Sequence, residues 1–202
     1  ASLANVPAFE GQVVVCPDVS GSMASPATGY RKGASSKVRC IDVAALIAAA
    51  ILRRNRQARL LPFEVAVVPV KLDPFARVAV NAAKLASIGG GGTNVSAPLA
   101  LLNSEGAKVD LVVIVSDNES WLDATRHGAT ATMNEWTRLK NRCPAAKLVC
   151  IDLQPYGTSQ AKSRKDILNV GGFSDAVFET LSRFASGDGE SDWVAEVKET
   201  EV

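Results

Sequence analysis

The chain has 202 residues, of which 47% are apolar and 21% are charged, and its 22 lysines and arginines nearly balance its 21 aspartates and glutamates. This balance excludes, on composition alone, a strongly basic nucleic-acid module and an acidic tail protein. The longest unbroken apolar run, residues 43–52, is about half as long as a bilayer crossing requires, and no export signal is visible. We therefore expect a soluble, cytoplasmic domain that does not contact membranes.

The cysteines and the single histidine restrict the chemistry further. The four cysteines form no CxxC pair and follow no zinc-binding spacing, and Cys16 and Cys150 lie inside apolar runs. We expect reduced thiols in an intracellular protein. With His127 as the one histidine of the chain, metal sites and catalytic schemes that need two histidines are excluded.

In chain order, the first half is predicted to contain a buried strand at 12–16 and a helix at 41–54. A pair of strands follows at 58–63 and 66–71, and then two helices at 76–86 and 96–102. Asp42 is placed to be the N-cap of the first helix. Because Pro62 and Pro69 are poorly suited to a central strand, we expect 58–63 and 66–71 to form an antiparallel hairpin at one edge of a sheet.

The second half is predicted to contain a strand at 109–115, a helix at 130–141 and two strands at 147–153 and 167–170. A helix at 174–185 and a half-exposed strand at 192–199 follow. Continuous apolar strands that alternate with helices indicate a parallel sheet covered on both faces. We therefore predict a doubly wound α/β domain over residues 12–186, whose mostly parallel central sheet carries one antiparallel edge strand. Residues 1–11 read as a linker and 187–202 as a C-terminal tail, and the linker-like start suggests a fragment of a longer protein.

Oxygen-bearing side chains follow three of the predicted segments. Asp18, Ser20 and Ser22 come directly after the first strand, Thr93 follows the glycine run 89–92, and Asp117 follows the strand 109–115. An open α/β sheet places its ligand site outside the carboxyl ends of its strands, so these five residues are expected to meet at one edge. Such an all-oxygen set suits a hard divalent cation, with Mg²⁺ favoured over Mn²⁺ or Ca²⁺.

Other interpretations of the same residues are weaker. Each residue alone could be a helix cap or an ordinary turn residue, but the five together favour a metal site. The glycine run lacks the lysine of a P-loop, and no GxGxxG follows the first strand. Ser20 lacks the GxSxG elbow of a hydrolase nucleophile, and His127 lies in a glycine- and threonine-rich loop. We therefore expect no enzymatic activity.

With these residues in place, the chain resembles a von Willebrand factor A domain with a metal-ion-dependent adhesion site. In that family, Asp-x-Ser-x-Ser, a distant threonine and a distant aspartate hold Mg²⁺ or Mn²⁺, and water or an acidic residue of a partner protein completes the coordination. By motif position, the resemblance implies that Ser20, Ser22 and Thr93 bind the ion directly. It implies that Asp18 and Asp117 bind it directly or through water.

Three further strings narrow the resemblance. SDNESW at 116–121, GGTNVSAPL at 91–99 and VGGFSDAVFETLSRF at 170–184 are similar to the A domain of the Ro autoantigen family, with a bacterial member favoured. Ro proteins pair this domain with a ring of helical repeats, the TROVE module, which is absent from this sequence. The resemblance implies a parent protein that binds small noncoding or misfolded RNA, with an exoribonuclease as one candidate partner.

Three functions remain open at this point. The first is a metal-dependent module that binds an acidic residue of a protein partner. The second is direct binding of RNA phosphates through the metal edge and the basic loop 30–39. The third is a vestigial metal site with a purely structural role. Arg53, Arg54, Arg56 and Arg59 follow a helix end, where the simplest interpretation is that they complement the helix dipole. Trp121 is either a contact near the site or a core residue.

Overall fold

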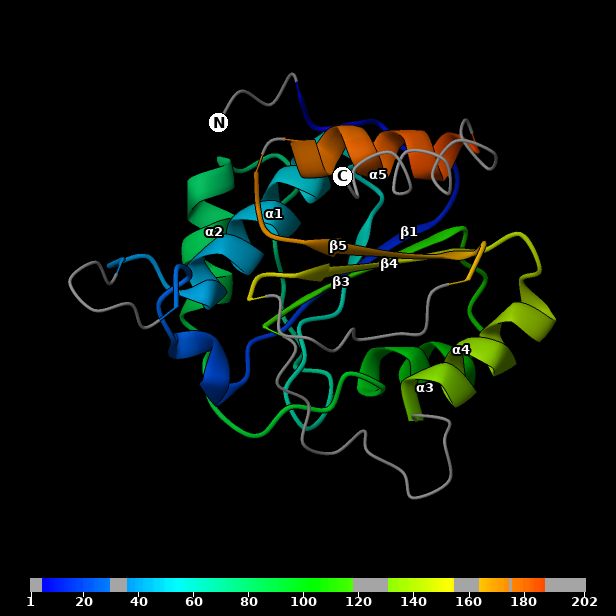
Figure 1. Cartoon of the computed structure of the whole chain (residues 1–202), viewed down its shortest axis with the longest axis horizontal. Helices are drawn as coiled ribbons and strands as arrows, with labels where there is room; N and C mark the ends of the chain where they lie inside the picture. Colours follow the sequence, from blue (N-terminus) through cyan, green and yellow to red (C-terminus); the bar gives the residue numbers. More distant parts are fainter. Residues whose placement is uncertain (1–4, 30–35, 118–130, 155–163, 175, 188–202) are drawn as a thin grey trace, which may run out of the picture.

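The structure, a computed structural model, describes residues 5–29, 36–117, 131–154, 164–174 and 176–187. Five parallel strands build the central sheet in the order β2-β1-β3-β4-β5 (Figure 1). Their bounds are β1 Val13–Pro17, β2 Arg59–Leu60, β3 Leu111–Ser116, β4 Lys147–Asp152 and β5 Ile167–Gly171. Strands β1 and β3 are buried along their whole length, as their continuous apolar sequences predict.

Helices cover both faces of this sheet (Figure 1). One face carries α1 Cys40–Arg54, α2 Val78–Ala86 and α5 Ala176–Ser186, and the other carries α3 Ala97–Ser104 and α4 Ala131–Arg142. Because successive strand residues point to opposite faces, Val13 and Val15 belong to the core beneath α1. Val14 and Cys16 belong to the core on the α3 and α4 side. The predicted α/β class with a parallel sheet is confirmed.

The strand order reverses between β1 and β3. The chain moves from β1 outward to β2 on one side, and β3, β4 and β5 follow on the other side. In open α/β sheets, ligands bind at such a reversal, in the crevice outside the carboxyl ends of the two strands. The segments that leave β1 and β3 begin at Asp18 and Asp117, and they therefore start at this crevice.

The predicted antiparallel hairpin at the sheet edge is wrong. Strand β2 retains only Arg59–Leu60, and it runs parallel to β1. After β2 the chain turns back, but in the described residues the two arms share a single isolated antiparallel bridge, between Phe63 and Val67. Pro62 and Pro69 have no amide hydrogen, so a regular ladder cannot extend along these arms. All the strands of the sheet are therefore parallel.

The other predicted strands and helices that fall in the described residues lie within two residues of their predicted bounds. The N-cap of α1 differs from the prediction: Arg39 occupies the cap, and the Asp42 carboxylate accepts a hydrogen bond from the Arg39 backbone N–H at 2.9 Å. The strand predicted at 192–199 and Trp121 lie outside the described residues. None of the described helices is long and apolar enough to cross a membrane.

Candidate metal centre

The ends of three strands hold the loop that begins at Asp18. The backbone N–H of Asp18 donates to the Val115 carbonyl of β3 at 2.8 Å, and the N–H of Val19 donates to the Phe63 carbonyl beyond β2 at 2.8 Å. A short 3₁₀ turn, Gly21–Ala24, follows. This anchoring carries the alternating Asp-x-Ser-x-Ser side chains to the crevice between β1 and β3.

Asp18 is a fully buried carboxylate with a donor on each oxygen. Its Oδ1 accepts the backbone N–H of Ser20 at 2.8 Å, and its Oδ2 accepts the hydroxyl of Ser116 at 2.6 Å. Burial raises the pKa of Asp18 to about 6 although these hydrogen bonds lower it, and the negative charge of Asp117 raises it further. A nearby cation would favour the charged form of this carboxylate.

Three hydroxyl oxygens lie side by side next to Asp18. Thr93 Oγ1 donates a hydrogen bond to Ser20 Oγ at 2.8 Å, and the hydroxyl oxygens of Ser20 and Ser22 are 3.2 Å apart. Ser20 and Thr93 are buried, whereas Ser22 is half-buried. The cluster therefore joins two segments that are more than seventy residues apart in sequence, and Ser22 is its more accessible member.

The glycine run brings Thr93 to this position. The Gly91 carbonyl accepts the N–H of Gly21 at 3.0 Å, and the Gly90 N–H donates to the Val19 carbonyl at 3.1 Å. Gly91 adopts φ +71°, a conformation that favours glycine, and a Cβ there would collide with the Glu64 carboxylate. Another residue at position 91 would therefore be strained by this φ and would have to displace the Glu64 carboxylate.

Asp117 follows β3 directly and is buried, with 1% of its surface exposed. Its charge acts on both Asp18 and the Cys40 thiol, whose pKa is raised by burial first and by Asp117 and Asp152 in addition. The structure thus brings four of the predicted residues together through hydrogen bonds, and it places Asp117 within electrostatic reach of Asp18.

The donor set fits a hard divalent cation. Oxygen atoms on adjacent corners of a Mg²⁺ octahedron, each about 2.1 Å from the ion, lie about 3.0 Å apart. The separations within the hydroxyl cluster, 2.8 and 3.2 Å, bracket this value. Among the residues that the structure describes, no three Asp, Glu, His or Cys side chains gather to hold a metal. The hydroxyl groups would therefore have to supply part of the coordination.

Two residues that the sequence did not single out support this cluster. Ser116, the last residue of β3, holds Asp18 through its hydroxyl. Gln154, after β4, donates through Nε2 to the Pro26 carbonyl at 2.8 Å and to the Ser25 hydroxyl at 3.2 Å, which fixes the end of the 3₁₀ turn. Their signal in the sequence was the position directly after the strands predicted at 109–115 and 147–153.

The basic loop expected at 30–39 is described only from residue 36 onward. Lys37 is exposed, whereas the Arg39 guanidinium is paired with the Asp42 carboxylate at 2.7 Å. Residues 30–35 lie outside the described residues. In the described part of this loop, the charge of Arg39 is therefore neutralised by Asp42 in the first turn of α1.

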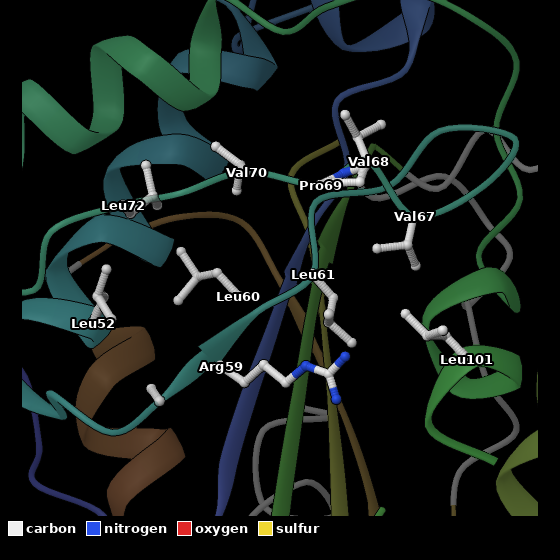
Figure 2. A pocket seen from close by; sticks show the side chains of 11 residues that line it. Leu52, Arg59, Leu60, Leu61, Val67, Val68, Pro69, Val70, Leu72 and Leu101 are labelled. Carbon is white, nitrogen blue, oxygen red and sulfur yellow. The ribbon is translucent and has the colours of Figure 1, made fainter. Parts of the chain in front are cut away.

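A separate groove of about 420 Å³ lies along the outer edge of β2 (Figure 2). Its walls are aliphatic side chains of α1, α3 and the segment 67–72, and Arg59 reaches across it between Leu61 and Leu101. Arg59 forms a two-pronged ion pair with Glu105, at 2.5 and 2.8 Å. None of the five predicted metal ligands lines this groove, so it is distinct from the candidate metal centre.

Comparison with known proteins adds family evidence to this geometry. A family model described as the Ro60 vWA domain matches residues 12–185. The RNA-binding protein RO60 of Deinococcus radiodurans is 28% identical over 172 residues, which cover 85% of this chain and 31% of that protein. The crystal structure of the D. radiodurans RO (RSR) protein is similar in fold, with a TM-score of 0.72 at 23% identity over 93% of this chain and 36% of that chain. The chain thus spans about a third of the length of these relatives.

Proposed function

Because the chain belongs to the Ro60 vWA domain family, we propose that it is a non-enzymatic, metal-dependent protein-docking domain of a Ro-type RNA-binding protein. The observation that carries this proposal is the hydroxyl cluster of Ser20, Ser22 and Thr93 next to the buried carboxylate of Asp18, with the buried Asp117 within electrostatic reach of Asp18. The two buried carboxylates repel each other, and a divalent cation would relieve that repulsion.

Each residue has a distinct part in this proposal. Ser20, Ser22 and Thr93 would hold the ion through hydroxyl oxygens, and Asp18 and Asp117 would supply the charge that selects a divalent cation. Mg²⁺ suits these donors best, and Mn²⁺ or Ca²⁺ would bind to the same oxygens. When bound, the ion supplies an electrophilic point that attracts an oxygen anion.

A carboxylate of a partner protein is the ligand that we propose at this point. Asp or Glu matches the hard, positively charged centre, whereas Lys or Arg would be repelled. The remainder of the Ro-type protein would bind small noncoding or misfolded RNA, and an exoribonuclease is a candidate for the protein that docks here. The domain would thus connect an RNA carrier to a protein partner without catalysing a reaction.

The thermal stability of variants with and without Mg²⁺ tests the metal centre. At a Mg²⁺ concentration one hundred times the Kd, binding to the native state should raise the melting temperature of the wild-type chain by about 5–10 °C. Thr93→Ala and Asp117→Ala should lose this rise. Thr137→Ala, which removes an exposed α4 hydroxyl that donates to the Met133 carbonyl, should keep it. An unchanged rise in both site variants would refute the proposed metal site.

A peptide titration tests the partner chemistry. A glutamate-containing peptide should bind the wild-type chain in Mg²⁺ and lose binding in EDTA, and its glutamine counterpart should not bind. A Mg²⁺ response in the melting temperature without peptide binding would favour the structural role of the site. RNA binding that requires both Mg²⁺ and Thr93 would favour the second candidate function, in which exposed Lys37 and the rest of the loop 30–39 meet RNA phosphates at the metal edge.

A further inference from the structure

At the C-terminal end of α1, two arginines contact a segment that carries an exposed aromatic ring. The Arg56 guanidinium lies 4.6 Å from the centre of the Phe75 ring, and Arg53 donates to the Pro74 carbonyl at 3.3 Å. Phe75 is 63% exposed, the highest value among the large apolar side chains that the structure describes as exposed. With Arg54 and Arg77, these residues form what we call the arginine surface: Arg53, Arg54, Arg56, Phe75 and Arg77.

The charge of this region stands out in a chain whose net charge is only +1. Residues 53–84 contain seven lysines and arginines but only two acidic residues, Glu64 and Asp73. Among the described residues, Arg59 is the one basic side chain of this stretch that forms an ion pair, with Glu105. Asp73 accepts the backbone N–H of Phe75 at 2.8 Å. Arg54, Arg56 and Arg77 are exposed and Arg53 is half-buried, so at least three of the four guanidinium groups face solvent, with Asp73 as the one acidic residue between positions 65 and 84.

Helix-dipole complementation accounts for only part of this surface. It explains Arg53 and Arg54, which lie in the last turn of α1. It does not explain Arg56 beyond the helix end or Arg77 at the start of α2. Nor does it explain an exposed phenylalanine that could pack into a core. Arg56 contacts the Phe75 ring and Arg53 contacts the neighbouring Pro74 carbonyl, so the end of α1 and the segment before α2 together present cations and an exposed aromatic ring.

We propose that the arginine surface binds single-stranded RNA, with phosphates held by the arginines and a base stacked against Phe75. Guanidinium groups match phosphate oxygens in paired geometry, and an exposed aromatic ring offers a stacking face that any base can use. An acidic chain such as polyglutamate would satisfy the charge, but it has no flat group to stack on the face of Phe75 opposite Arg56. The ring and the arginines together therefore favour a polynucleotide.

This surface is distinct from the metal centre, and neither proposal requires the other. Helix α1 begins with Cys40, near the carboxyl ends of the strands, and ends at Arg54. Its 15 residues span about 22 Å, which separates the arginine surface from the metal edge. The domain would thus present RNA and a protein partner at opposite ends of one helix.

Fluorescence anisotropy of the 202-residue chain with a labelled 12-nucleotide single-stranded RNA in EDTA tests this inference. Arg54→Glu combined with Arg56→Glu should weaken binding at least about tenfold and reduce the slope of log K against log salt by about 1.4, the loss of two phosphate contacts. Phe75→Ala should weaken binding by about 5- to 100-fold and leave the salt slope unchanged. Circular dichroism melting checks that each variant is folded.

Matched control variants distinguish RNA binding at the arginine surface from a non-specific effect of positive charge anywhere on the chain. Lys108→Glu combined with Lys165→Glu makes the same charge change at exposed positions elsewhere, and Val80→Ala removes an exposed apolar side chain of α2; both should keep RNA affinity within about twofold. Equal losses in the two charge-reversed pairs would overturn the proposal. So would an unchanged affinity in Phe75→Ala, equal competition by polyglutamate, or RNA binding that appears only with Mg²⁺ and disappears in Thr93→Ala.

Discussion

At the residue scale, Ser116 shows how a side chain outside the predicted ligand set supports the candidate metal centre. Its hydroxyl is completely buried and donates to Asp18 Oδ2 at 2.6 Å, across the boundary between β3 and β1. The Ser20 backbone N–H occupies the other oxygen of Asp18. Ser116 therefore fixes the orientation of the carboxylate before any ligand arrives.

Ser116→Ala should destabilise the chain. The substitution removes the donor to a buried carboxylate oxygen, and such a loss costs about 1–3 kcal/mol of the free energy of unfolding. It should also raise the pKa of Asp18 further, because the Ser116 hydrogen bond lowers that pKa. Urea denaturation in EDTA measures the loss. Ser104→Ala, which removes an exposed α3 hydroxyl, is the control and should change stability by less than about 0.5 kcal/mol. Equal losses in the two variants would contradict the role given to Ser116.

The five candidate ligands could be proposed from the sequence because their chemistry and positions follow from simple rules. Asp18 and Asp117 each follow a buried strand, and the ends of parallel strands meet at one edge. Ser116 escaped notice because the direction of a hydroxyl depends on the register between strands and on the side-chain rotamer. The N-cap of α1 was misplaced for a similar reason: Asp42 can accept an N–H from the cap position or from the third helical position, and the sequence pattern does not distinguish the two.

At the element scale, hydrophobic patterning predicted the central strands and the helices well. Continuous apolar runs such as β3 leave few alternatives in a domain of this size. The edge of the sheet was harder to predict. Residues 58–63 and 66–71 have the composition of strands, but Pro62 and Pro69 interrupt the ladder, and β2 retains two residues. Whether an edge segment pairs as a strand depends on which of its backbone groups can form hydrogen bonds, and amino-acid composition does not show this.

Asp166 links two elements on the face opposite α1. Its Oδ2 accepts the indole N–H of Trp136 of α4 at 2.9 Å, and Lys140 of α4 lies 3.7 Å away. Arg164 donates to its Oδ1 at 3.0 Å, just before β5 begins. Burial raises the pKa of Asp166, but the hydrogen bonds and the two cations together lower it below its ordinary value of 3.8. The charged form of Asp166 therefore stabilises the folded chain.

This shift predicts a pH dependence for Asp166→Asn. Because the pKa in the folded state is below that in the unfolded state, the stabilisation from Asp166 is present above about pH 4 and is lost as the pH falls through the folded pKa. Asp166→Asn should be less stable than wild type by about 1 kcal/mol at neutral pH, and the difference should shrink on acidification. Urea denaturation across this pH range measures it. Glu179→Gln, at an exposed position of α5, is the control, and a constant difference for Asp166→Asn would contradict the prediction.

At the scale of the whole molecule, the doubly wound topology separates two surfaces. The reversal of strand order between β1 and β3 creates the crevice that holds the hydroxyl cluster. The crossover through α1 then carries the chain away from this edge, and the arginine surface forms where α1 ends. The chain covers about a third of its Ro relatives, and the two surfaces that we propose as binding sites lie at different places on it.

We propose that five side chains from three segments hold one divalent cation. Anomalous diffraction from crystals of the chain soaked in Mn²⁺ tests this proposal, because the peak locates the ion without assumptions about function. We expect one strong peak at the crevice between β1 and β3, about 2.1–2.2 Å from the hydroxyl oxygens of Ser20, Ser22 and Thr93. A crevice without a peak at saturating Mn²⁺, with Thr93 still hydrogen-bonded to Ser20, would contradict it.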